Sequence, residues 1–107
     1  MNEPEVREIV RRYRQGLEEI FGDQLVAVLL YGSWARGEAH EESDIDVVCV
    51  LRPPFDYGEA IRLTSALTAR LSLAHDVAIS RVFISEEDWR NRHLPFYVNL
   101  RREGAPV

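Results

Sequence analysis

The sequence contains one cysteine, Cys49, so an internal disulfide is excluded. Cys49 lies in an apolar run, where a small buried side chain is its simplest role. A zinc site needs clustered thiols and imidazoles, and here a single thiol accompanies three scattered histidines. We therefore expect neither a disulfide framework nor bound zinc.

Long apolar runs and excess basic charge are also missing. No stretch of 18 apolar residues and no charged-then-apolar leader occurs, which predicts a cytoplasmic protein with no membrane segment. The net charge is −5 and the pI is near 5.2. Because long nucleic acid is bound through a basic face, this balance argues against such a partner. A nucleotide held through metal ions needs no basic face.

The 107 residues predict a single domain over 1–107, whose 46% hydrophobic content allows a modest core. Apolar periodicity predicts helices over 5–21 and 56–74, and apolar runs predict strands over 25–31, 45–51 and 77–84. The stripe expected to face the core in the second long helix is Ala60, Leu63, Leu67, Leu71 and Ala74. Beyond an N-cap at Ser85, we expect a helix over 89–102 interrupted at Pro95, and a free tail or short extension over 105–107.

The lengths of the connections predict how the strands pair. A long helix joins the second strand to the third, which is typical of a parallel crossover, whereas the short first connection favours an antiparallel pair. The expected fold is α/β (α+β-like), with a small mixed sheet flanked by helices. On this topology Asp44, Asp46 and Asp76, at the starts of the second and third strands, would meet at one edge of the sheet.

The stretch between the first two strands carries the chemistry. Gly32 and Ser33 end an apolar run and can open a short helix, whose free backbone N–H groups would meet a phosphate. Asp44 and Asp46 stand at i and i+2 at the start of the next strand, so their carboxylates share one face. A phosphate cradle beside a metal-binding carboxylate pair indicates metal-dependent chemistry on a nucleotide.

The string Gly32-Ser33-Trp34-Ala35-Arg36-Gly37 is followed by Asp44-Ile45-Asp46, with ten residues between Ser33 and Asp44. This pattern resembles the signature of the DNA polymerase beta nucleotidyltransferase superfamily. It is most similar to the minimal nucleotidyltransferase branch, whose members are commonly antitoxins of HEPN-domain toxins. The resemblance implies a nucleotidyltransferase fold and transfer of AMP from ATP, with two Mg²⁺ ions. It also implies that the acceptor is a tyrosine of a HEPN toxin, with which this chain would form a hetero-oligomer.

The resemblance also implies roles for individual residues. Asp44, Asp46 and Asp76 would be catalytic and bind the metal, Asp76 next to the acceptor hydroxyl. The candidate nucleotide-binding residues are Gly32, Ser33, Arg36 and Ser43.

Several of these residues have plainer alternatives. Arg36 is a candidate for a triphosphate contact, because its planar guanidinium group matches the geometry of phosphate oxygens. The alternative is a surface ion pair with Glu38 or Glu42. Ser43 more simply caps or orients the turn at Asp44, and Trp34 stacks on a base or packs beneath the loop. The arginines near the end of the chain either solvate a helix or contact an acidic partner; they are Arg90, Arg92, Arg101 and Arg102.

Two other functions are compatible with the same residues. One is nucleotidyl transfer to a small molecule such as an aminoglycoside, which usually requires a further helical domain or a dimer. The other is a non-catalytic antitoxin that neutralises its toxin by binding alone.

Overall fold

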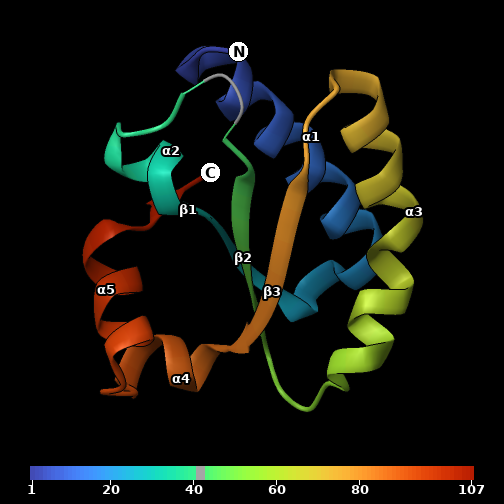
Figure 1. Ribbon diagram of the computed structural model, residues 1–107. Coiled ribbons are helices and arrows are strands. Elements are labelled where there is room, and N and C mark those ends of the chain that lie inside the picture. Colours follow the sequence, from blue (N-terminus) through green and yellow to red (C-terminus); the bar gives the residue numbers. More distant parts are fainter. Residues whose placement is uncertain (41–42) are drawn as a thin grey trace.

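The computed structural model describes residues 1–40 and 43–107 (Figure 1). The helices are α1 (Glu3–Phe21), the 3-10 helix η1 (Gly22–Gln24), α2 (Gly32–Arg36), α3 (Tyr57–His75), α4 (Glu86–Asn91) and α5 (Pro95–Glu103). The strands are β1 (Leu25–Tyr31), β2 (Ile45–Leu51), β3 (Ile79–Ser85) and β4 (Ala105–Pro106). They form one sheet in the order β3-β2-β1-β4.

The strand pairing confirms the expected mixed sheet. β1 is antiparallel to β2, with Tyr31 opposite Asp46, and β2 is parallel to β3, with Ile45 opposite Ile79. The last residues are not a free tail, because β4 pairs antiparallel with β1 and the Val107 N–H donates to the carbonyl oxygen of Val28 at 3.0 Å.

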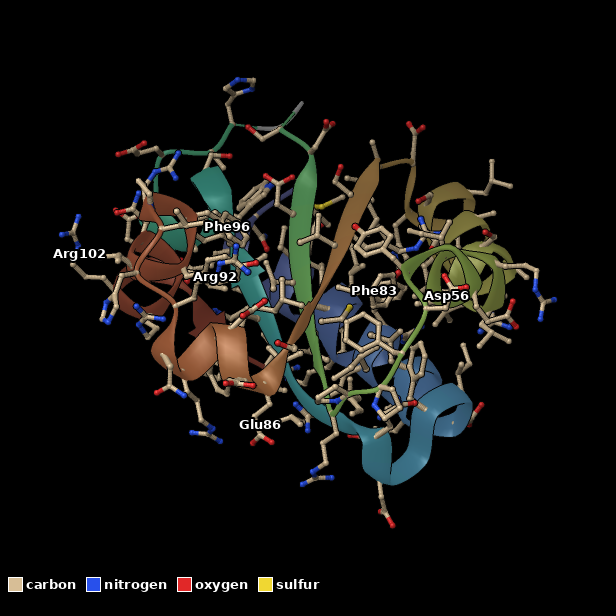
Figure 2. All side chains as sticks on the ribbon, turned by 90° about the horizontal axis from the view of Figure 1, so that it is seen from below. Asp56, Phe83, Glu86, Arg92, Phe96 and Arg102 are labelled. Atoms are coloured by element: carbon tan, nitrogen blue, oxygen red, sulfur yellow. The ribbon has the colours of Figure 1, made fainter. Side chains whose placement is uncertain are left out.

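Helices cover both faces of the sheet. α1 and α3 pack on one face, and α4 with α5 lies on the other (Figure 1). Figure 2 shows Phe83 of β3 on the α3 side and Phe96 of α5 on the opposite side. Helix α1 begins at an N-cap where the Asn2 side chain accepts from the Glu5 N–H, and its apolar stripe is fully buried. That stripe comprises Val6, Ile9, Val10, Tyr13 and Leu17.

The predicted core stripe of α3 is partly wrong. Leu63 is 41% exposed and Ala74 is also exposed, while Thr64 and Thr68 are buried. Their hydroxyls are satisfied, because Thr64 accepts from the Arg81 Nε at 2.7 Å and the Thr68 and Tyr13 hydroxyls share a 2.7 Å hydrogen bond. A buried polar group is tolerated when it is paired, so hydroxyl-bearing side chains can occupy a face that hydropathy assigns to leucine.

Two element boundaries also differ from the expectation. β3 begins at Ile79 rather than Val77, because α3 runs to His75 and the chain reverses at Asp76 before the strand starts. The Ser85 N-cap is confirmed, but the last helical segment is interrupted earlier than expected, since α4 ends at Asn91 and α5 starts at Pro95, whose fixed φ suits a first helical position. Cys49 is buried and unpaired, as expected, and burial raises the pKa of its thiol to about 12. No helix of the described residues is long and apolar enough to cross a membrane.

Candidate active site

The junction between β1 and α2 lies directly against β2. Gly32 has φ of +71°, a backbone conformation that side-chain-bearing residues rarely adopt. A Cβ atom at this position would overlap Oδ2 of Asp46 and would lie 3.3 Å from its Cγ. Only glycine therefore allows the backbone that opens α2 to approach the Asp46 carboxylate this closely.

The two aspartates at the start of β2 have different surroundings. Asp44 is exposed in the segment before the strand, whereas Asp46 is half-buried within it. Burial raises the pKa of Asp46, the neighbouring Asp44 charge raises it further, and the Arg36 guanidinium acts in the opposite direction. The Asp46 carboxylate is thus a partly desolvated anion beside a second anion, which is an arrangement that a cation stabilises.

Arg36 ends α2 on the surface beside this pair. Its Nε donates to Glu38 at 3.1 Å, and its Nη1 lies 3.9 Å from a Glu103 carboxylate oxygen. The ion pair with Glu38 is one of the two alternatives expected from the sequence; Glu42, the other partner considered, lies outside the described residues. An exposed pair of this kind contributes little to stability, so the guanidinium can exchange Glu38 for a stronger anion. Contact with a triphosphate stays a prediction.

Trp34 packs beneath the loop, as the plainer of its two expected roles requires. Its side chain is 7% exposed, and its indole Nε1–H donates to the carbonyl oxygen of Ser43 at 3.3 Å. The Ser43 hydroxyl accepts from the His40 backbone N–H at 3.0 Å, and the Ser43 N–H donates back to the His40 carbonyl at 2.9 Å. Ser43 is therefore held against His40 directly before Asp44, and Trp34 ties Ser43 to the helix that carries Ser33.

The structure does not place Asp76 as the sequence predicted. Asp76 is the C-cap of α3, in the left-handed conformation with φ of +50°, and its N–H donates to the Ser72 carbonyl. It ends a helix three residues before β3 begins, so its expected position directly at the start of that strand is wrong. Among residues 1–40 and 43–107, no three His, Cys, Asp or Glu side chains are grouped so that they could hold a metal ion. The expected convergence with Asp44 and Asp46 is not observed there.

The register of the sheet reveals a residue that the sequence analysis missed. Ser80, not Asp76, lies beside Asp46 on the neighbouring strand, and Tyr31 lies beside Asp46 on the other side. The Tyr31 ring packs edge-on against Phe96 of α5, with ring centroids 5.8 Å apart. A strand of seven residues counted back from the Ser85 cap begins at Ile79 and would have indicated this register. The sequence prediction started the strand too early because it placed Asp76 at the strand start.

Comparison with known proteins identifies the class. Residues 10–100 match the nucleotidyltransferase domain family, and this chain belongs to that family. Two curated relatives come from Methanocaldococcus jannaschii. “Putative protein adenylyltransferase MJ0141” is 33% identical over 78 residues, covering 73% of this chain and 78% of that protein. “Putative protein adenylyltransferase MJ0604” is 30% identical over 96 residues, covering 89% of this chain and 90% of the relative.

Solved structures share the fold at low sequence identity. A crystal structure of a toxin–antitoxin with AMP-PNP has a TM-score of 0.58 and 20% identity, with 99% of this chain and 72% of that chain covered. A putative nucleotidyltransferase from Sulfolobus solfataricus has a TM-score of 0.55 and 17% identity, with 94% and 83% covered. The predicted nucleotidyltransferase fold and enzyme class are confirmed.

Proposed function

We propose that this chain transfers AMP from ATP to a hydroxyl group of a protein, a tyrosine of a HEPN toxin with which it forms a hetero-oligomer, and so acts as an antitoxin. The observation that carries the proposal is the close approach of Gly32 to the Asp46 carboxylate, which sets the turn proposed to bind phosphate beside the carboxylate pair. The names of the two archaeal relatives support transfer to a protein. The toxin–antitoxin structure with AMP-PNP supports both the nucleotide and the kind of partner.

The residues of α2 are the proposed phosphate-binding groups. The Ser33 hydroxyl and the free N–H groups at the start of α2 would hold the terminal phosphates, because they are donors without a helical acceptor. Arg36 stands at the other end of this short helix and would exchange Glu38 for a phosphate oxygen. Ser43 contributes by fixing the backbone directly before Asp44 through its hydrogen bond with His40.

The two carboxylates at the start of β2 are suitable ligands for Mg²⁺. Magnesium takes oxygen ligands and is held by one or two carboxylates together with substrate phosphates. Asp44 and Asp46 supply two carboxylates. Burial, followed by the charge of Asp44, raises the pKa of Asp46, and a bound cation would stabilise this partly desolvated carboxylate. Mg²⁺ bound there would neutralise charge on the phosphate oxygens and polarise the α-phosphorus.

The chain positions the reacting groups for displacement at phosphorus. The acceptor hydroxyl oxygen forms a bond to the α-phosphorus, the bond to the pyrophosphate oxygen breaks, and the hydroxyl proton passes to solvent. Gly32 fixes the depth at which the phosphates approach Asp46, and the Trp34–Ser43 hydrogen bond holds Asp44 in register with them. Positioning of this kind is a large part of phosphoryl-transfer catalysis.

The test is label transfer in a lysate of the chain's own host. Wild type and the Asp44→Asn/Asp46→Asn variant are incubated with Mg²⁺ and α-phosphate-labelled ATP, with Asp23→Asn as an exposed-carboxylate control. We expect a labelled protein band with the wild type and Asp23→Asn but none with the double variant. The band is then identified and the toxin assayed with each variant.

Three outcomes would contradict the proposal in different ways. Label confined to small molecules would favour transfer to an aminoglycoside-like acceptor. Full neutralisation of the toxin by the double variant would favour an antitoxin that acts by binding alone. A labelled band that persists in the double variant would remove Asp44 and Asp46 from the reaction.

A further inference from the structure

The parallel pairing of β2 and β3 fixes which side chains stand next to Asp46. Asp46 is opposite Ser80, and Val47 is opposite Arg81. Residues paired across parallel strands project to the same face of the sheet, with backbones about 5 Å apart. The next residue along β3, Arg81, points to the α3 side, where its Nε donates to Thr64 and its Nη2 to the Ile61 carbonyl. Ser80 and Asp46 therefore share the face that points away from α3.

Ser80 is exposed on that face and carries no charge. On the other side of Asp46 stands Tyr31, which has a phenol in place of a carboxylate and packs against Phe96. β3 is the edge of the sheet in the described chain, so no further strand stands beyond Ser80. Asp76, the remaining candidate, caps α3 and forms no metal-binding group with the β2 pair among the described residues.

We infer that Asp44 and Asp46 hold a single divalent cation together with the nucleotide, and that Ser80 occupies the place on β3 where a third carboxylate would be needed to hold a second cation. This inference rests on the proposed function and corrects the two-ion expectation. A second cation about 4 Å from the first would share the two aspartates and gain only a neutral hydroxyl from β3. Repulsion between the cations would then be poorly offset, because magnesium and manganese sites depend on anionic oxygen ligands.

One consequence concerns the acceptor hydroxyl. The carboxylate that would bind a cation beside that hydroxyl is absent from β3, so the described part of the chain supplies little help in removing its proton.

Counting bound Mn²⁺ tests the inference without measuring activity. Wild type, Ser80→Asp, Ser80→Asn and Asp76→Asn are each loaded with an equimolar non-hydrolysable ATP analogue and titrated with Mn²⁺, which is followed by electron paramagnetic resonance. We expect one bound ion in the wild type, in Ser80→Asn and in Asp76→Asn. Ser80→Asp should bind a second ion at least tenfold more tightly than the wild type, with the spectrum of a magnetically coupled pair.

The controls separate this inference from the proposed function. Ser80→Asn matches aspartate in size and lacks its charge, so it isolates the carboxylate. Two tightly bound ions in the wild type, or loss of one of them in Asp76→Asn, would overturn the inference and leave the proposed function standing. Failure of Ser80→Asp to gain an ion while it still binds the analogue would also overturn it. Absence of Mn²⁺ binding in every protein would overturn the proposed function and this inference with it.

Discussion

Replacing Gly32 by alanine separates backbone strain from encroachment on the active site, because the chain offers a matched control. Gly32 and Gly37 both have positive φ, +71° and +73°. A Cβ at Gly32 would collide with the Asp46 carboxylate, whereas a Cβ at Gly37 would meet nothing within 4 Å. Gly32→Ala and Gly37→Ala therefore impose a similar conformational cost and differ in what the added methyl group touches.

The two variants should lose similar stability and very different activity. An alanine held at positive φ costs about 1 to 2 kcal/mol, so both should lower the free energy of unfolding by that amount in urea titrations. Only Gly32→Ala displaces the Asp46 carboxylate, and a misplacement of about 1 Å at a reacting centre can cost roughly 100-fold in rate. We expect a loss of that size in label transfer and a weaker Mn²⁺ affinity for Gly32→Ala, with both nearly unchanged for Gly37→Ala.

The refuting results are specific. Equal loss of label transfer in the two variants would show that strain in α2, and not contact with Asp46, governs the site. Full activity of Gly32→Ala would show that the carboxylate is not used where the structure places it.

Three further perturbations follow from the geometry. Trp34→Phe keeps the packing and removes the hydrogen bond to Ser43. Mn²⁺ affinity should therefore fall several-fold, while the free energy of unfolding in urea titrations falls by about 1 kcal/mol or less. Unchanged Mn²⁺ affinity would refute the positioning role of Trp34. Asp76→Gly should preserve or raise the melting temperature, because glycine accepts positive φ, whereas Asp76→Ala should lower the free energy of unfolding by about 1 kcal/mol. A melting temperature lowered equally by both variants would argue against the role of Asp76 as the C-cap of α3. Burial and the Asp44 charge raise the pKa of Asp46, so the ionised carboxylate destabilises the fold and Asp46→Asn should raise the melting temperature at neutral pH. This gain should vanish as the pH falls through the pKa of Asp46. The wild type should lose Mn²⁺ affinity over the same pH range. No stability gain at neutral pH would contradict that reading.

The sequence predicted the parts of the fold that depend on local pattern. The strands over 25–31 and 45–51 are confirmed at both ends, since each is an apolar run with glycine, aspartate or proline within two residues of each end. Their antiparallel pairing and the parallel crossover through α3 are also confirmed, because connection length restricts topology.

The errors arose where tertiary contacts decide the outcome. Asp76 can start a strand or cap a helix in the left-handed conformation, and local sequence does not distinguish the two. Thr64 and Thr68 replace Leu63 in the core because Arg81 and Tyr13 supply their hydrogen bonds. Ser80 has no signal of its own, since its place beside Asp46 follows only from the register of two strands. The nucleotide-binding roles of Ser33, Arg36 and Ser43 stay predictions.

The most direct test of the central claim compares ATP labelled at the α-phosphate with ATP labelled at the γ-phosphate, using the same lysate and Mg²⁺. Transfer of AMP breaks the bond between the α- and β-phosphates, so we expect a protein band that is labelled from α-labelled ATP and unlabelled from γ-labelled ATP. The same band should gain the mass of one or more AMP units. A band labelled only from the γ-phosphate would mean phosphorylation instead and would contradict the assignment of this chain's activity.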